Sequence, residues 1–194
     1  MPSREIIPDP HYYYHVYNRV SNQIKLFTSK ENYLYCIRLI RRYALKYNID
    51  IIAYCLMPNH YHMLVFLNKA DSLSKFIGVL FNTYVQAFNK QQKRKGPLFT
   101  DRFKNVLIEK EEYILHLCRY IHLNPVKANL VKTPEDWKFS DCCDWIGRKH
   151  LRSYQISFIR DYFSDSEFYR EFISDYNDTE QVEKLMNQYY FDSD

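Results

Sequence analysis

Two strongly apolar segments, Ile49–Met57 and His60–Leu67, are separated in the chain by only Pro58 and Asn59. Proline at the second position of a four-residue turn and asparagine at the third favour a tight reversal. Both segments are short and contain β-branched or aromatic residues, as strands do. The pattern therefore predicts a β-hairpin, and the second strand reads as a buried central strand of a sheet.

The rest of the chain supplies the other elements of such a sheet. In chain order, periodicity and capping signals predict a strand over 11–20, a helix from about 29 to 47, the hairpin, a helix that begins after 71 or 72, a strand over 103–108 and a helix over 111–124 that Pro125 ends. The order β-α-β-β-α-β is that of an α+β, ferredoxin-like or RRM-like antiparallel sheet with two helices on one face. The last helix and a partly helical C-terminal tail are additions to it.

Composition excludes several classes of protein. The 194 residues contain only three glycines, so neither a Walker A loop nor a dinucleotide-binding fingerprint can be built. Five cysteines form no CxxC pair, which argues against a zinc ribbon or a disulfide framework and for a reduced compartment. No apolar run reaches membrane-spanning length, and the N-terminus lacks a secretory signal. We expect a cytoplasmic protein without a membrane partner.

Charge is unevenly distributed along the chain. Residues 1–160 hold 25 Lys/Arg against 13 Asp/Glu, whereas residues 161–194 hold 2 against 10. A basic body suits a polyanion such as nucleic acid, although ordinary surface charge is the alternative. The acidic tail would weaken that attraction unless it folds elsewhere.

The predicted central strand opens with two histidines, His60 and His62. Alternate residues of a strand point to the same side, about 6.5–7 Å apart, so the two imidazoles can converge on one cation. An isolated pair of this kind more often has no ligand and merely lies on a strand that begins near solvent. Here the pair lies at the start of a strand that is otherwise buried, directly after the turn.

A second polar group lies on the helix predicted over 111–124. At about 100° per residue, one apolar stripe docks this helix on the sheet: Ile114, Leu117, Cys118 and Ile121. Tyr120 and Asn124 are side by side in a neighbouring stripe, with Tyr113 and His116. Aromatic packing and helix termination are the alternatives for Tyr120 and Asn124 taken singly.

Taken together, these motifs resemble those of the REP-associated tyrosine transposases, a branch of the single-tyrosine HUH (insertion-sequence) transposases. The resemblance extends from about residue 11 to 131. It rests on Tyr14-His15-Val16-Tyr17-Asn18-Arg19, on Met57-Pro58-Asn59-His60-Tyr61-His62, on Gly96-Pro97-Leu98-Phe99 leading to Arg102-Phe103-Lys104, and on Arg119-Tyr120-Ile121-His122-Leu123-Asn124-Pro125-Val126-Lys127-Ala128. The chain has Val20 and Tyr61 where that family usually has glycine and a simple apolar residue.

The resemblance implies the roles of four residues. His60, His62 and Asn124 are the expected metal ligands, and Tyr120 is the expected nucleophile. Nitrogen and oxygen ligands with open positions suit Mg²⁺ or Mn²⁺. Attack by the phenolic oxygen would leave a 5′-phosphotyrosine and a free 3′-OH. His116 or His122 could shuttle the phenolic proton, but His122 is expected to point away from Tyr120.

The expected partner is single-stranded DNA, folded as a hairpin beside a short guide sequence and bound by a monomer or homodimer that is nucleoid-associated when acting on DNA. Exposed tyrosines among Tyr12, Tyr13, Tyr14 and Tyr61 could stack on bases, although core packing is the more common role. Candidate DNA-binding residues are Asn18, Arg19, Lys93, Arg94, Lys95, Arg102 and Lys104, with Lys90 in the same basic run as Lys93.

We expect residues 1–135 to form the catalytic domain and residues 136–194 a C-terminal extension, acidic from 161. The first alternative function is a domesticated protein that binds a single-stranded DNA or RNA hairpin without cutting it. The second is a metal hydrolase that uses water. Such a hydrolase would be expected to carry an acidic ligand near the histidines, but position 64 is leucine.

Overall fold

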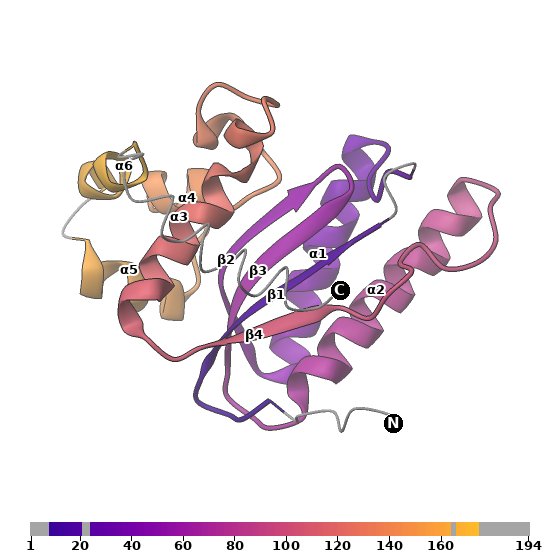
Figure 1. Cartoon of the computed structure of the whole chain (residues 1–194), viewed down its shortest axis with the longest axis horizontal. Helices are drawn as coiled ribbons and strands as arrows, with labels where there is room; N and C mark the ends of the chain where they lie inside the picture. Colours follow the sequence, from indigo (N-terminus) through magenta and orange to yellow (C-terminus); the bar gives the residue numbers. More distant parts are fainter. Residues whose placement is uncertain (1–7, 21–23, 164–165, 175–194) are drawn as a thin grey trace.

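The computed structural model describes residues 8–20, 24–163 and 166–174. Its elements are β1 (Tyr13–Arg19), α1 (Lys30–Tyr47), β2 (Ile49–Met57), β3 (His60–Leu67), α2 (Ser72–Gln91), β4 (Lys104–Ile108), α3 (Glu111–Lys127), the 3₁₀ turn η1 (Pro134–Asp136), α4 (Cys142–Gly147), α5 (Ser153–Tyr162) and α6 (Ser166–Ser174) (Figure 1). The strands form one antiparallel sheet in the order β2-β3-β1-β4. The predicted α+β class and its β-α-β-β-α-β order are confirmed.

The predicted hairpin is present with its predicted boundaries. Met57 pairs with His60, which leaves Pro58 and Asn59 as the two turn residues. The carbonyl of Pro58 accepts a hydrogen bond from the amide of Leu26 at 2.8 Å. The carbonyl of Asn59 accepts one from the amide of Val20 at 2.9 Å. These bonds tie the turn to the chain that follows β1 and hold the start of β3 in place.

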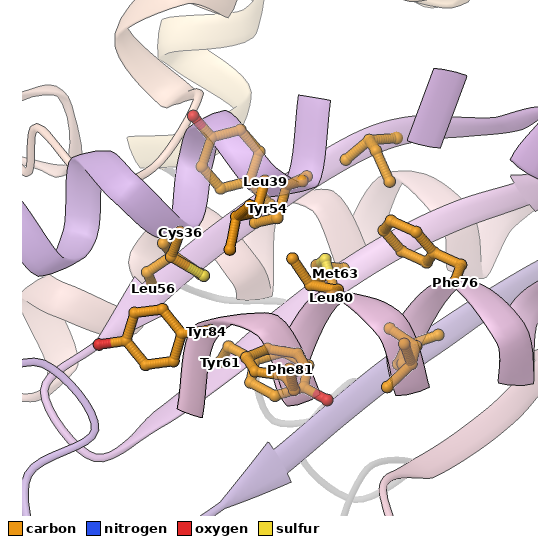
Figure 2. Packing of buried hydrophobic residues seen from close by; sticks show 14 of the residues in the cluster. Cys36, Leu39, Tyr54, Leu56, Tyr61, Met63, Phe76, Leu80, Phe81 and Tyr84 are labelled. Atoms are coloured by element: carbon orange, nitrogen blue, oxygen red, sulfur yellow. The ribbon is translucent and has the colours of Figure 1, made fainter. Parts of the chain in front are cut away.

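Strand β3 is buried on both faces, and its side chains alternate between two cores. One set packs against α1 and α2: Tyr61, Met63, Val65 and Leu67. Figure 2 shows this core, in which Tyr61 stacks on Phe81 with ring centroids 4.3 Å apart. The other set faces α3 and includes Leu64 and Phe66. Because the side-chain period of a strand is two, His60 and His62 share the α3 face.

Helix α3 continues past the proline that was expected to end it. The predicted end at Asn124 is wrong, since the helix runs to Lys127 with Pro125 inside it. Proline lacks the amide that would bond to the carbonyl of Ile121, yet that is the only helical donor lost. The next turn is closed by Ala128, whose amide donates to the carbonyl of Asn124 at 3.0 Å. Pro125 is itself buried, so packing favours the extra turn.

The segment after α3 packs on the same side of the sheet as α3. Asp141 is 2% exposed and is the acceptor around which this packing is organised. It accepts hydrogen bonds from buried donors on four sides: the Tyr54 amide at 2.8 Å, His122 Nε2 at 3.0 Å, Trp145 Nε1 at 3.2 Å and Gln155 Nε2 at 3.1 Å. Tyr169 of α6 donates to Nδ1 of the same His122. The network joins β2, α3, α4, α5 and α6.

The first part of the acidic segment belongs to this packing. Phe163, Tyr169 and Ile173 are buried in the core on the α3 face. Residues 161–163 and 166–174 are therefore part of the fold. Residues 175–194, which carry most of the expected acidic tail, lie outside the described residues, as does any docking of that tail. No helix of the described residues is long and apolar enough to cross a membrane.

Replacing Asp141 with alanine should destabilise the whole chain. A buried donor that loses its acceptor costs about 1–3 kcal/mol, and several donors share this carboxylate. We expect the free energy of unfolding to fall by at least about 3 kcal/mol in urea titrations followed by circular dichroism. Asp161→Ala, at an exposed position of α5, is the control and should change it by less than about 0.5 kcal/mol. Equal losses in the two variants would contradict a structural role for Asp141.

Candidate active site

The structure brings His60 and His62 together at the start of β3. Their ring centroids are 5.1 Å apart and their planes are nearly perpendicular, at 84°. His62 is 3% exposed, and His60 is partly buried at the end of the strand. The side chain of Asn59 accepts a hydrogen bond from Nδ1 of His60 at 2.7 Å. Its amide oxygen can only accept, so Nδ1 of His60 carries the proton and Nε2 carries a lone pair.

Tyr120 comes to the same place from α3. Its ring meets His62 edge to face, with centroids 5.5 Å apart at 85°. The predicted apolar stripe of the helix is buried against the sheet and sets this approach: Ile114, Leu117, Cys118 and Ile121. Tyr120 itself is only partly buried. The phenol is thus held beside the imidazole of His62 and remains partly accessible to solvent.

Asn124 lies one turn further along α3 and links the helix to the histidines. Its amide nitrogen donates to the carbonyl of Tyr120 at 3.0 Å, and its side chain is hydrogen-bonded to His60. The amide oxygen is the atom of Asn124 suited to a cation. All four residues singled out in the sequence therefore meet at one edge of the contact between α3 and the sheet.

Burial keeps both histidines neutral. It lowers the pKa of His60 to about 4, helped by the nearby charge of Arg19, while the hydrogen bond with Asn124 acts in the opposite direction. Burial also holds the pKa of His62 well below its ordinary value, with smaller contributions from His15, His60 and Arg19. Neutral imidazoles have the lone pairs that a cation needs.

The donor set fits a divalent metal ion. Two neutral imidazoles and one amide oxygen would hold the ion without cancelling its charge, and they leave coordination positions open for a phosphate. Within the described ranges, no group of three or more His, Cys, Asp or Glu side chains is arranged to hold a metal. The third ligand expected from the sequence motif is of another type, the amide oxygen of Asn124.

Two residues of β1 also belong to the site, and the sequence did not single them out for it. Tyr17 pairs with His62 across the sheet, and its ring lies 5.9 Å from that of His62. His15 is completely buried, with Nε2 2.9 Å from Nδ1 of His62. The available signal was their spacing, because residues two apart on a strand share a face.

The candidate DNA-binding residues are spread more widely. Arg19 lines a cavity of about 440 Å³ beside His60, together with Lys25, Asn59 and Leu130. Its positive charge and position suit a phosphate close to the histidines. This is the candidate that the structure brings closest to the proposed ligands.

The other candidates have different surroundings. The side chain of Asn18 bonds to the carbonyl of Asp101 at 3.1 Å. Arg94 donates hydrogen bonds to the side chain of Asn89, at the end of α2, and to the carbonyl of Pro97. Lys104 pairs with Tyr17 across the sheet, and the remaining candidates are exposed: Lys93, Lys95 and Arg102. These contacts indicate structural roles for Asn18 and Arg94.

The two histidines of α3 form hydrogen bonds with other residues. His122 is buried between Asp141 and Tyr169, as its predicted direction away from Tyr120 implied. His116 bonds to Arg119 at 2.7 Å, and its ring lies 5.9 Å from Phe172 of α6. Neither arrangement supports the expected proton shuttle.

The expected base-stacking tyrosines also need correction. Tyr14 and Tyr61 are buried in the core on the α1 and α2 side, so they are not available to bases. Tyr13 is partly buried and lies against Phe66, with ring centroids 4.9 Å apart. Tyr12, at 47% exposure, is the most accessible of the four.

The buried neutral histidines predict an acid-sensitive fold. Burial lowers the pKa of His15 to about 3. A histidine whose pKa is lower in the folded chain than in the unfolded one takes up its proton on unfolding, so stability falls as pH falls below about 6.5. Each such residue contributes up to about 1.4 kcal/mol per pH unit. In EDTA, we expect the free energy of unfolding to fall steadily from pH 6.5 to pH 4.5, as measured by urea titration.

Two variants check the origin of this slope. His15→Gln should make the dependence of unfolding free energy on pH shallower, because about one proton fewer is taken up on unfolding. His11→Gln, at an exposed position, should leave it unchanged. A slope that is the same in His15→Gln and in the original chain would contradict the assignment.

Comparison with known proteins places the chain in a family. Residues 10–124 match the family model described as "Transposase IS200 like". A Haemophilus influenzae protein named as a REP-associated tyrosine transposase is 27% identical over 104 residues, which are 48% of this chain and 59% of the relative. A solved structure of a REP-associated tyrosine transposase bound to a REP hairpin superposes with a TM-score of 0.63 at 20% identity, over 74% of this chain and 84% of that one. The chain belongs to the IS200-like transposase family.

Proposed function

We propose that this chain is a metal-dependent single-stranded DNA endonuclease and strand transferase that acts through a covalent bond to Tyr120. Transposases of the family cleave and rejoin DNA and generally depend on a metal ion. One observation supports the proposal for this member: the Tyr120 ring lies 5.5 Å from that of His62, one of the three neutral side chains that we propose as metal ligands. The boundary between a catalytic domain at 1–135 and an extension at 136–194 remains a prediction.

His60, His62 and Asn124 would hold a divalent ion such as Mg²⁺ or Mn²⁺. When bound, the ion would polarise the scissile phosphate and fix its position. Arg19, at the wall of the neighbouring cavity, would attract and orient the same phosphate. The three proposed ligands are neutral, so they leave the positive charge of the site available to the DNA.

The Tyr120 hydroxyl oxygen attacks the phosphorus and loses its proton. The bond between phosphorus and the 3′-oxygen breaks, and that oxygen takes up a proton as a free 3′-OH. The DNA 5′ end remains attached as a phosphotyrosine. A 3′-OH can then attack this ester and release Tyr120, which rejoins DNA without ATP. The ammonium of Lys127 lies 5.4 Å from the centre of the Tyr120 ring and adds positive charge beside the phenol.

The proposed substrate is a DNA hairpin flanked by a short single-stranded guide sequence. Support comes from the relative that was solved with a REP hairpin and from the basic balance of residues 1–160. The basic cavity beside His60 could admit the backbone next to the cleaved phosphate. Association of the monomer or homodimer with the nucleoid would follow from this binding.

Tyr120→Phe should abolish a covalent protein–DNA adduct while it preserves binding of the hairpin. The change removes the attacking oxygen and keeps the ring that packs against His62. Adducts with labelled hairpin strands in Mn²⁺ are separated on denaturing gels, and binding is measured by fluorescence anisotropy. Tyr113→Phe, two turns earlier on α3, is the control and should retain the adduct. An adduct that persists in Tyr120→Phe contradicts the proposal, and the lack of any adduct with the original chain favours a non-cleaving hairpin-binding protein.

Removing the metal ion should separate cleavage from binding. We expect EDTA to eliminate the adduct, because the phosphate then loses its Lewis acid. Addition of Mn²⁺ or Mg²⁺ should restore the adduct. His60→Ala should behave as the chelator does and should not recover with added Mn²⁺ at concentrations that saturate the original chain. Fluorescence anisotropy in EDTA should show that the original chain and His60→Ala both still bind the hairpin. Full cleavage in EDTA would rule out metal-dependent chemistry.

A further inference from the structure

His15 is a completely buried histidine that the proposed reaction does not use. It lies on β1, and its ring is stacked on His62 with centroids 5.1 Å apart at an angle of 12°. Its Nε2 is 2.9 Å from Nδ1 of His62, whereas its own Nδ1 is buried without a hydrogen-bond partner. A buried polar atom without a partner costs about 1–3 kcal/mol. An apolar residue at this position would avoid that cost, so the imidazole calls for another explanation.

The hydrogen bond between the two rings can run in either direction. If His15 donates, Nδ1 of His62 must accept, and a neutral His62 then carries its proton on Nε2, where it blocks a cation. If His62 donates from Nδ1, its Nε2 has a free lone pair, and His15 carries its own proton on Nδ1. Only the second arrangement is compatible with a metal ligand at His62.

His60 shows the same arrangement with a different partner. The Asn59 side-chain oxygen accepts the proton of His60 Nδ1 at 2.7 Å and so leaves Nε2 of that ring deprotonated. Both imidazoles therefore have an atom against Nδ1 that is able to accept its proton: Oδ1 of Asn59 beside His60 and Nε2 of His15 beside His62. Metal-binding histidines generally have such a partner, which selects the tautomer and fixes the ring.

We propose that His15 is a positioning residue for the metal site: it accepts the Nδ1 proton of His62 and thereby directs the Nε2 lone pair of His62 toward the cation. The inference rests on the proposed function, because it assumes that His62 binds a metal ion. His15 contacts neither the ion nor the DNA in this role. It acts through the tautomer and orientation of His62.

The test compares three variants of the full chain. His15→Phe keeps a flat ring in the stack but removes the acceptor. His15→Gln retains a side-chain oxygen that can reach Nδ1 of His62. Tyr61→Phe is the matched control, because its hydroxyl is also buried without a partner but lies on the other face of β3.

The first measurement is Mn²⁺ affinity without DNA, by electron paramagnetic resonance. We expect His15→Phe to weaken binding about 10–100-fold, His15→Gln to recover much of the loss, and Tyr61→Phe to bind as the original chain does. Thermal unfolding in EDTA should show that His15→Phe still folds cooperatively, because the change exchanges one unpartnered buried nitrogen, Nδ1 of His15, for another, Nδ1 of His62. Unchanged Mn²⁺ affinity in a folded His15→Phe overturns the inference, as does a loss in His15→Gln as large as in His15→Phe.

The second measurement reads the tautomer of His62 directly, from long-range ¹H–¹⁵N spectra without metal. The original chain should carry the His62 proton on Nδ1, and His15→Phe should shift it toward Nε2. A proton on Nε2 in the original chain overturns the inference. Neither measurement requires cleavage, so both can be made in the Tyr120→Phe background. A wrong role for His15 can therefore be distinguished from a failure of the proposed DNA cleavage.

Discussion

The alternation of side chains along β3 is the constraint on which the rest of the molecule depends. Because this strand is covered on both faces, one set of its residues must fill the core under α1 and α2, and the other set must face α3. A shift of register by one residue would turn His60 and His62 toward α1 and α2, and Tyr61 toward α3. Burial of Tyr61, Met63 and Val65, at about 1.5–3 kcal/mol each, opposes such a shift. The face that carries His60 and His62 is thus held in place by the hydrophobic face behind it.

Helix α3 is held on two sides, and Tyr120 and Asn124 lie where the helix meets the sheet. Its apolar stripe docks on the sheet, while His122 and Arg119 connect it to the C-terminal helices. Arg119 donates to the carbonyl of Phe172 at 3.1 Å, and its guanidinium lies 4.3 Å from the centre of the Phe172 ring. A nucleophile works best when its approach is fixed before the substrate arrives. The C-terminal helices therefore contribute to the site although none of the proposed site residues lies on them.

Much of the fold follows from local patterns. The hairpin was predicted to the residue, because Pro58 and Asn59 act within four residues of chain and both strands have consistent apolar patterns. Pro125 shows the limit of this reasoning. Its effect on the preceding residue is a local preference, and burial of the ring with an extra helical turn outweighed it. Local energies predict an element well when no stronger tertiary contact opposes them.

The sequence by itself determined the class of fold and the family resemblance. It also singled out His60, His62, Tyr120 and Asn124 as the expected site, because each lies in a short motif with a definite spacing. Tertiary structure alone decided that His15 meets His62, that Asp141 receives donors from several elements, and that Tyr61 is buried while Arg19 faces a cavity. The physical reason is separation along the chain. His15 and His62 are 47 residues apart, and Tyr54 and Asp141 are 87 apart. Strand order and packing bring such residues together, and no local pattern records which buried polar group will find which partner.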